Sequence, residues 1–229
     1  MKIFLDTANI NHIQRCIEYY EIDGVTTNPS IIAKEKKLFD PLLNKIAAIL
    51  GDMKPLFIQV VATDFQGIIE DAKAIHQRIK GKVIVKIPVT VEGFKAIKYL
   101  NHNGIEVAAT SIITSQQGLM AARCGAKYLI PYVNRVDNIM GDGINVVSEL
   151  LQMIEVYDFN CKVIAASFKN LQQIHHCTLQ GVHGVTIGAD LLDNLVKHDL
   201  TQSSVKQFSE DWGKSFYNVK SIVEMDQKG

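Results

Sequence analysis

The sequence predicts an α/β protein folded as a (β/α)8 TIM barrel with an additional C-terminal helix. Eight short runs rich in β-branched residues recur along the whole chain, and amphipathic stretches with helical spacing lie between them. No linker or low-complexity tract interrupts this alternation, which is typical of a parallel sheet covered by helices. The chain has 229 residues, of which 47% are hydrophobic. Barrels of roughly 200 to 250 residues form one domain, so we expect a single domain over residues 1–229.

The eight expected strands are continuous apolar runs rather than a clean alternation of polar and apolar residues. Strands that are buried on both faces of a parallel sheet have this pattern, because helices cover the outer face. In chain order the runs are KIFLD (2–6), GVTTN (24–28), LFIQVV (56–61), VIVKIPV (83–89), EVAATSI (106–112), YLIPYV (128–133), KVIAASF (162–168) and GVTIG (184–188).

The stretches between these runs carry helix signals. The first opens at Asn9, and its apolar positions recur at three and four residues: Ile10, Ile13 and Ile17. The fifth opens with a T-x-x-Q capping box at residues 114–117, and Gly125 follows as a stop signal. The sixth carries its apolar residues between Val146 and Ile154, whereas the seventh is less regular and opens near Asn170.

A doubly wound open sheet is the alternative fold. Such a sheet normally stops at five to seven strands, and a dinucleotide-binding one has a G-x-G-x-x-G turn after its first strand. Here that turn reads DTANI, without the glycines. The sequence therefore favours the barrel.

A further helix is predicted after the eighth unit, at roughly residues 204–225. Its apolar side chains fall on one stripe: Val205, Phe208, Trp212, Phe216 and Val219. The stripe could pack on the underside of its own barrel. Because a closed barrel already has its ring of helices, we expect it to pack on a neighbouring subunit of a homo-oligomer.

Composition and charge exclude several classes of protein. The 24 basic and 24 acidic residues give no net charge and form no block of like charge, so no nucleic-acid partner is expected. No apolar run approaches the ~20 residues that cross a membrane, and the N-terminus turns polar at Asp6, which predicts a cytoplasmic protein without a membrane partner. The four cysteines form no C-x-x-C pair, and we expect all of them to be reduced.

Polar residues stand at or near the C-terminal ends of the expected strands. In a barrel of this type the active site lies at that end, so these side chains would ring one polar pocket of the size of a polyol. Any one of them could instead cap the next helix or face water. The set is Asp6, Thr26, Asn28, Gln59, Lys86, Thr110, Tyr132, Arg135 and Ser167.

Lys86 is the strongest single signal in the set. It interrupts VIVKIPV, a strand that should be buried on both faces. Desolvation favours the neutral form of a lysine amine, and a neutral amine is the nucleophile that forms Schiff bases with carbonyl compounds. The alternative is a structural ion pair between Lys86 and Asp6 across the barrel.

The other residues suggest roles around such a lysine. Asp6 could orient a substrate hydroxyl or move a proton, and Asn28 could hold a second hydroxyl. Tyr132 offers a general acid or base, and Gln59 could hold a water molecule.

A phosphate site is expected beside them. Arg135 and Ser167 suit a phosphate held by a guanidinium, a hydroxyl and helix amides, and Lys169 adds positive charge nearby. The alternative interpretation is that Arg135 only pairs with Asp137.

Two further patterns carry less weight. His175, His176 and Cys177 adjoin one another on an expected helix, where adjacent side chains point about 100° apart, so we expect no metal there. Gly181 and Gly184 precede a strand, which is typical of an ordinary turn rather than of a phosphate-binding loop.

The chain resembles the transaldolase family, within it the small-subunit branch that contains fructose-6-phosphate aldolase. The resemblance runs essentially from end to end. It rests on FLDTAN (4–9), GVTTNPSII (24–32), VKIPVTVEG (85–93), PYVNRVD (131–137) and AASFKN (165–170).

The resemblance implies a metal-independent class I enzyme without a cofactor. Lys86 would be its Schiff-base lysine, Asp6 and Asn28 would contact substrate hydroxyls, and Arg135 with Ser167 would bind the phosphate of a sugar phosphate. Small members of the family look like pentamers or decamers in which the C-terminal helix reaches a neighbouring subunit.

Two positions favour the aldolase over the transaldolase. By the resemblance, transaldolases carry a glutamate in the third strand and a phenylalanine in the sixth, where this chain has Gln59 and Tyr132. Gly188 departs from the aldolase pattern, which has proline there. The expected activity is reversible cleavage of fructose 6-phosphate to dihydroxyacetone and glyceraldehyde 3-phosphate. The alternatives are a small transaldolase of the pentose phosphate pathway and a non-catalytic barrel that binds a sugar phosphate.

Overall fold

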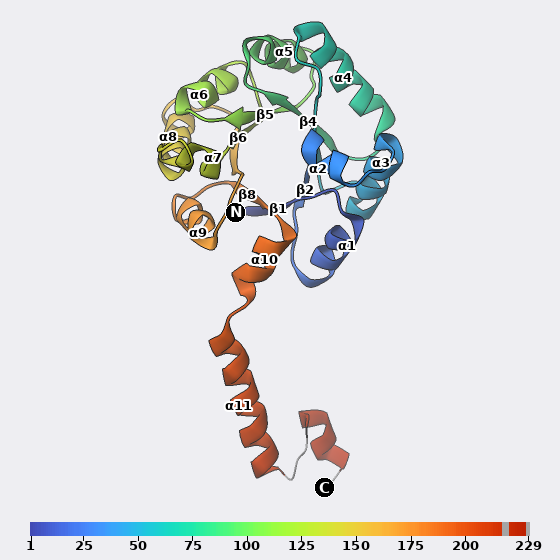
Figure 1. Cartoon of the computed structure of the whole chain (residues 1–229), viewed down its shortest axis with the longest axis vertical. Coiled ribbons are helices and arrows are strands. Elements are labelled where there is room, and N and C mark those ends of the chain that lie inside the picture. The colour runs from blue at the N-terminus through green and yellow to red at the C-terminus, as the bar shows by residue number, and fades with distance from the viewer. Residues whose placement is uncertain (217–219, 228–229) are drawn as a thin grey trace. The chain divides into compact units, whose positions relative to one another are not determined.

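Eight parallel strands close into a barrel in the order of the chain, which confirms the predicted fold class (Figure 1). The structure is a computed structural model that describes residues 1–216 and 220–227. The strands are β1 (Lys2–Asp6), β2 (Gly24–Thr26), β3 (Leu56–Gln59), β4 (Val83–Pro88), β5 (Val107–Ile112), β6 (Tyr128–Pro131), β7 (Lys162–Ala165) and β8 (Gly184–Ile187). Each overlaps one of the eight predicted runs.

Helices surround the strands (Figure 1). They are α1 (Ile10–Tyr19), α2 (Pro29–Lys34), α3 (Phe39–Leu50), α4 (Phe65–Arg78), α5 (Val91–His102), α6 (Ser115–Arg123), α7 (Val133–Asp137), α8 (Gly143–Val156), α9 (Leu171–Leu179) and α10 (Ala189–Val196). The predicted start signals are confirmed: Asn9 and Asn170 cap α1 and α9, and Thr114 forms a capping box with Gln117 on α6. The short helices α2 and α7 were not expected as separate elements.

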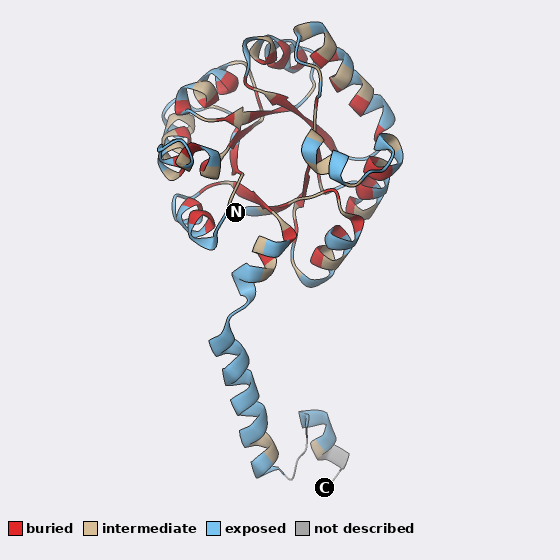
Figure 2. Cartoon of the chain, in the orientation of Figure 1, coloured by how far each residue is buried: buried red, intermediate tan, exposed pale blue. Residues whose placement is uncertain are grey.

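Several of the predicted polar residues of the site stand at inward-facing positions of the strands. Phe4, Phe57, Ile84, Ala108, Ile130 and Ile164 belong to the buried cluster inside it, and the strands are buried along most of their length (Figure 2). Side chains on a strand alternate between its two faces, so the residue two positions further on also points inward. Two residues after the first five members of this cluster stand, in the same order, Asp6, Gln59, Lys86, Thr110 and Tyr132.

Aromatic rings fill the barrel below that polar layer. The Phe57 ring meets Phe4 and Tyr128 edge to face, with centroids 5.4 and 5.2 Å apart. This arrangement is favourable for aromatic pairs and leaves a packed apolar floor. The site therefore opens only toward the C-terminal ends of the strands.

The chain divides into two compact units, Met1–Leu191 and Leu192–Gly229. The second contains α11 (Asp199–Ser215) and a 3-10 helix, η1 (Ile222–Gln227). The helix expected over residues 204–225 thus begins earlier and ends at Ser215, and weak helix formers, Gly213 and Ser215, occupy its last turn. Val219, the last residue of the predicted stripe, lies outside the described residues.

Within the described residues, no helix has the length and apolar character needed to cross a membrane.

Candidate active site

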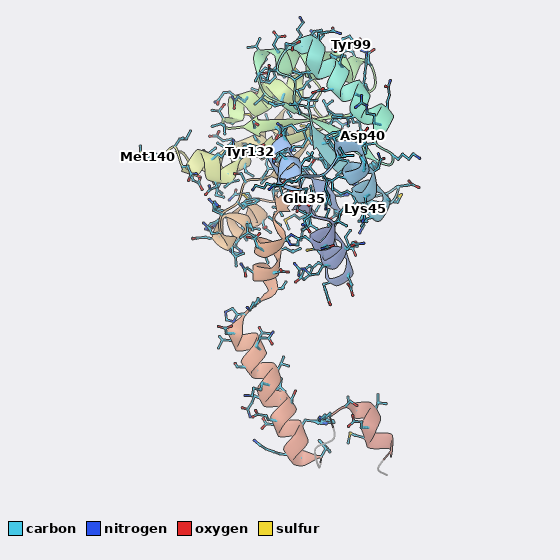
Figure 3. All side chains as sticks on the ribbon, turned by 45° about the vertical axis from the view of Figure 1, so that its right-hand side comes forward. Glu35, Asp40, Lys45, Tyr99, Tyr132 and Met140 are labelled. Atoms are coloured by element: carbon cyan, nitrogen blue, oxygen red, sulfur yellow. The ribbon has the colours of Figure 1, made fainter. Side chains whose placement is uncertain are left out.

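A small cavity lies at the C-terminal mouth of the barrel. Its volume is about 130 Å³, and its lining residues are Asp6, Asn28, Lys86, Tyr132, Arg135, Ala166, Ser167 and Thr186. Six of these are residues that the sequence predicted for the site. In Figure 3 Tyr132 lies at the barrel, whereas Met140, which is almost fully exposed, projects away from it.

Lys86 is buried at this mouth. Only 3% of the residue is exposed, and its Nζ donates a 2.8 Å hydrogen bond to the backbone oxygen of Thr27. No ion pair within 4.0 Å joins it to Asp6 in the described chain, so the structural ion pair considered for these residues is wrong. The amine is held by one neutral carbonyl and is accessible from the cavity.

Asp6 faces the same cavity from β1. The Thr26 hydroxyl donates a 2.7 Å hydrogen bond to its Oδ1. Burial raises the pKa of the Asp6 carboxyl above its usual value, while the positive charge of Lys86 and the hydrogen bond from Thr26 act in the opposite direction. A carboxyl group in this environment can exchange a proton more readily than one on the surface.

Tyr132 follows β6 and contacts two polar side chains. Its hydroxyl lies 3.1 Å from the Thr110 hydroxyl, and the Arg135 guanidinium lies 4.9 Å from its ring centroid. The register between β5 and β6 shifts between Ala109 and Ile112, and Ser111 has φ 61° there. This bulge accompanies the placement of Thr110 beside the tyrosine, as bulges often do next to active sites.

Gln59 pairs with Lys86 in the register of β3 and β4. Its Oε1 is buried and has no hydrogen-bond partner. A buried amide oxygen of this kind is normally satisfied, so it is a place where a water molecule or a substrate hydroxyl would bind.

Asn28 caps the helix that follows it and also lines the cavity. Its Oδ1 caps α2 by accepting a 3.0 Å hydrogen bond from the backbone nitrogen of Ile31, and the residue also lines the cavity. The cap fixes the side chain in place and sets which face of its amide can meet a ligand.

Arg135 and Ser167 lie together at the cavity, although they come from different segments. Arg135 is on α7, and Ser167 follows β7 with φ 62°, a conformation that is uncommon for a serine. Asp137 accepts hydrogen bonds from Gly143 and Gln173 instead, at 2.9 and 2.6 Å, and forms no ion pair with Arg135 in the described chain. The interpretation that Arg135 only pairs with Asp137 is therefore wrong.

Lys169 does not line the cavity. Its side chain is exposed, and its backbone nitrogen donates to Gln173. Any charge that it contributes acts from outside the cavity.

The next feature is the run of two histidines and one cysteine on α9, His175, His176 and Cys177. Over residues 1–216 and 220–227 there is no group of three or more His, Cys, Asp or Glu side chains that could hold a metal ion. Burial raises the pKa of the Cys177 thiol to about 12, which disfavours the thiolate that would react or ligate.

Sequence reasoning missed two residues of the site. Thr186 lines the cavity from β8, and the backbone of Thr27 accepts from Lys86. The signal for Thr186 was present, because it stands two residues after Gly184 in an otherwise apolar strand. Thr27 acts through its carbonyl oxygen, which no side-chain pattern reveals.

The fold and the site define an α/β barrel protein with a buried amine, a carboxyl and a phenol converging at its C-terminal mouth. The sequence matches the family described as Transaldolase/Fructose-6-phosphate aldolase over residues 3–227. The chain belongs to this family, which is one of enzymes.

Comparison with solved structures supports the architecture only. A mandelate oxidase mutant with a monooxide FMN adduct has a TM-score of 0.56 and 10% sequence identity to this chain. The match covers 82% of this chain and 64% of the oxidase, so the chain spans less than two thirds of that protein. At this identity the likeness extends to the fold and not to the reaction.

The raised pKa of Asp6 predicts a pH-dependent effect of Asp6→Asn on stability. A carboxyl whose folded pKa exceeds its unfolded value stabilises the protein below the unfolded pKa, near 3.8, and loses that contribution as pH rises through the folded pKa. Asparagine does not titrate. We expect the free energy of unfolding of Asp6→Asn, relative to the original protein, to increase from pH 4 to pH 7 in urea titrations. A difference that stays constant or falls over this range would contradict the assignment.

Proposed function

We propose that the protein is a class I aldolase that reversibly cleaves fructose 6-phosphate to dihydroxyacetone and glyceraldehyde 3-phosphate. The observation that carries the proposal is the buried Lys86 amine, 3% exposed and facing a polar cavity, in a chain of the transaldolase and fructose-6-phosphate aldolase family. A binding protein gains nothing from burying an amine without an anionic partner, whereas Schiff-base chemistry requires a desolvated one.

The cleavage begins at the ketose carbonyl. The Lys86 amine adds to that carbon, and loss of water from the resulting carbinolamine gives an iminium that accepts electrons. The bond between C3 and C4 then breaks, and its electron pair moves into the iminium to form an enamine. Protonation of the enamine carbon and hydrolysis release dihydroxyacetone and restore the amine.

Two groups serve the proton transfers. Asp6, ionised in the free site and with a raised pKa, takes a proton from the Lys86 nitrogen as that nitrogen adds to the carbonyl and passes it to the departing carbinolamine hydroxyl. It also holds substrate hydroxyls together with Asn28. Tyr132, supported by Thr110 and by a water molecule bound to Gln59, removes the proton from the C4 hydroxyl.

The phosphate binds at the side of the cavity formed by Arg135 and Ser167. The guanidinium provides charge-assisted hydrogen bonds and Ser167 a hydroxyl, while Lys169 contributes positive charge from the exterior.

The same-family alternative is a transaldolase, which passes the enamine carbons to a second aldose phosphate. Transfer requires an enamine that is protected from water. Tyr132 and the unpaired Gln59 oxygen supply a proton and a water site beside Lys86, and this favours release of free dihydroxyacetone.

The first prediction tests the lysine. Treating the protein with dihydroxyacetone and borohydride should reduce the Schiff base, inactivate the enzyme and add the mass of the reduced donor to the peptide that contains Lys86. Lys86→Met should abolish labelling and activity. Lys82→Met, an exposed residue just before β4, is the control and should retain both. Label on another lysine, measured by mass spectrometry, would refute the proposed function.

The second prediction tests the phosphate site. Losing a charge-assisted hydrogen bond costs roughly 1.5 to 3 kcal/mol, or about ten- to over a hundredfold. Arg135→Ala should therefore lower kcat/KM for glyceraldehyde 3-phosphate by this factor beyond any loss that it causes for unphosphorylated glyceraldehyde. Arg123→Ala, at the exposed end of α6, is the matched control. Equal losses for both acceptors would show that Arg135 has a structural role.

The third prediction separates cleavage from transfer. Tyr132→Phe should suppress release of dihydroxyacetone from fructose 6-phosphate and spare or raise transfer to erythrose 4-phosphate, because it removes the proton beside the enamine. Tyr128→Phe, four residues earlier in the barrel floor, should leave the ratio of the two rates unchanged. If the unmodified protein makes sedoheptulose 7-phosphate much faster than it releases dihydroxyacetone, the protein is a transaldolase.

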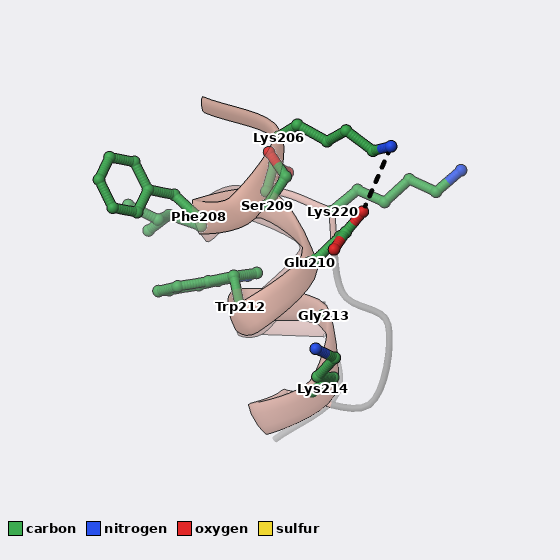
Figure 4. A pocket seen from close by; sticks show the side chains of 10 residues that line it. Lys206, Phe208, Ser209, Glu210, Trp212, Gly213, Lys214 and Lys220 are labelled. Atoms are coloured by element: carbon green, nitrogen blue, oxygen red, sulfur yellow. Dashed lines mark ion pairs between the residues drawn. The ribbon is translucent and has the colours of Figure 1, made fainter. Parts of the chain in front are cut away.

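The C-terminal unit supports a proposal about assembly. Phe208 is 70% exposed, and the rings of Trp212 and Phe216 lie against each other at an interplanar angle of 38°, with centroids 4.4 Å apart. Phe208 and Trp212 line a hollow of about 900 Å³, which Lys220, Ser221 and Ile222 also line (Figure 4). We propose that a second copy of the chain covers this apolar surface in a homo-oligomer, a pentamer or a decamer.

The fourth prediction tests that assembly. Deletion from Ser204 onward should lower the mass per particle in light scattering or cause aggregation, since the surface that meets the helix becomes exposed. Phe208→Ser should weaken the oligomer, and Gln202→Glu, a polar change on the same helix, should not. A truncated protein of unchanged subunit number would disprove the proposal.

A further inference from the structure

A hydrogen bond joins the hydroxyls of Thr26 and Thr186 inside the barrel. Their Oγ1 atoms are 2.5 Å apart, and the residues are 0% and 3% exposed. Thr26 comes from β2 and Thr186 from β8, the two strands that pair with β1 on either side. The contact therefore crosses the inner face of β1, next to Asp6.

The packing below leaves these hydroxyls few alternatives. Phe4 lies level with Gly24 on β2 and with Thr186 on β8. A Cβ at Gly24 or Gly184 would come within 3.2 or 3.1 Å of its ring, so the two glycines let Phe4 fill the floor. The ring offers no conventional hydrogen-bond partner. The two threonines therefore bond to each other, and Thr26 also bonds to the carboxyl above.

The number of hydroxyl protons sets the direction of these two hydrogen bonds. Thr26 has one hydroxyl proton, which it donates to Asp6 Oδ1 at 2.7 Å. The proton between the two threonines must then come from Thr186. The hydrogen bonds run in one direction, from Thr186 to Thr26 to Asp6.

We propose that Thr186 is a positioning residue that acts through Thr26 to orient and stabilise the Asp6 carboxylate against the substrate. This inference rests on the role given to Asp6 in the proposed function. A hydroxyl that accepts a hydrogen bond becomes a better donor, by about 10 to 30% per bond. Thr186 thus strengthens the hydrogen bond from Thr26 and favours the ionised form of the carboxyl.

Other groups that can carry charge also face Asp6. Lys86 on β4, Tyr132 after β6 and Arg135 on α7 face the same cavity and can carry charge. The neighbouring strands β2 and β8 present hydroxyls there, which do not titrate near neutral pH. Removing the Thr186 hydroxyl therefore changes the support of Asp6 without removing a charge.

The test measures Asp6 directly in the ligand-free protein. Carbon NMR of protein labelled at the aspartate carboxyl, with the resonance assigned by Asp6→Asn, gives its pKa without turnover. Thr186→Val should raise that pKa by roughly half a unit, because the carboxylate loses a cooperative hydrogen bond. Thr186→Ser, which keeps the hydroxyl, should not. Thr186→Ala removes the hydroxyl without added bulk and should reproduce the valine result, including where valine prevents folding.

A double variant tests the route. In a Thr26→Val background, Thr186→Val should produce no further shift, because the link is already broken. Thr27→Val removes another buried hydroxyl, one that donates to the Phe57 carbonyl, and should leave the pKa of Asp6 unchanged. An unchanged or lowered pKa in Thr186→Val, or a full shift in the Thr26→Val background, would overturn the proposal.

Turnover gives an independent readout. The acid limb of kcat/KM for fructose 6-phosphate should move up by the same half unit in Thr186→Val, a loss of about threefold at a fixed pH on that limb. Absence of borohydride labelling at Lys86 in the unmodified protein would refute the proposed function, while the NMR titration would still decide the role of Thr186.

Discussion

The site depends on the burial of one amine. Lys86 occupies an inward position of β4, where an ammonium group loses its hydration, and the described residues give it a single hydrogen-bond partner, the Thr27 carbonyl. This carbonyl is neutral, so it holds the Lys86 nitrogen in place without forming an ion pair with it. The charge of Lys86 acts to lower the pKa of the Asp6 carboxyl through space, and no ion pair joins the two within 4.0 Å in the described chain. The amine therefore remains open to a carbonyl compound entering from the mouth.

Much of this arrangement could be predicted from the sequence, because it follows from the alternation of side chains on strands. Once the eight runs are taken as barrel strands, residues two positions beyond an interior apolar side chain point to the mouth, and Asp6 after Phe4 and Lys86 after Ile84 do line the cavity there. The phosphate candidates, Arg135 and Ser167, do not follow from this rule and were predicted only from their places after the sixth and seventh strands. The structure adds that Arg135 lies on α7 and that Ser167 has a left-handed backbone conformation, and both residues line the cavity.

What the sequence did not reveal depends on backbone and on register. The bulge in β5 shifts the pairing after Ala109, and the carbonyl of Thr27 has no side-chain signature. Thr186 was missed because its partner is 160 residues away, and a single threonine in an apolar strand is common. The end of α11 at Ser215 was also misplaced, since the apolar stripe continues in sequence beyond the point where helix propensity fails.

Asp6 and Tyr132, the two groups proposed to transfer protons, are supported in the same way on different sides of the barrel. Asp6 is supported by Thr26 and, through it, by Thr186, from β1, β2 and β8; Tyr132 is supported by Thr110, from β5 and β6. Each pairs a titratable side chain with a threonine hydroxyl, and Lys86 on β4 faces the same cavity as both. Such a separation suits the proposed reaction, which moves protons at two carbons of one substrate: the carbonyl carbon bound to the lysine, and the carbon whose hydroxyl loses its proton as the carbon–carbon bond breaks.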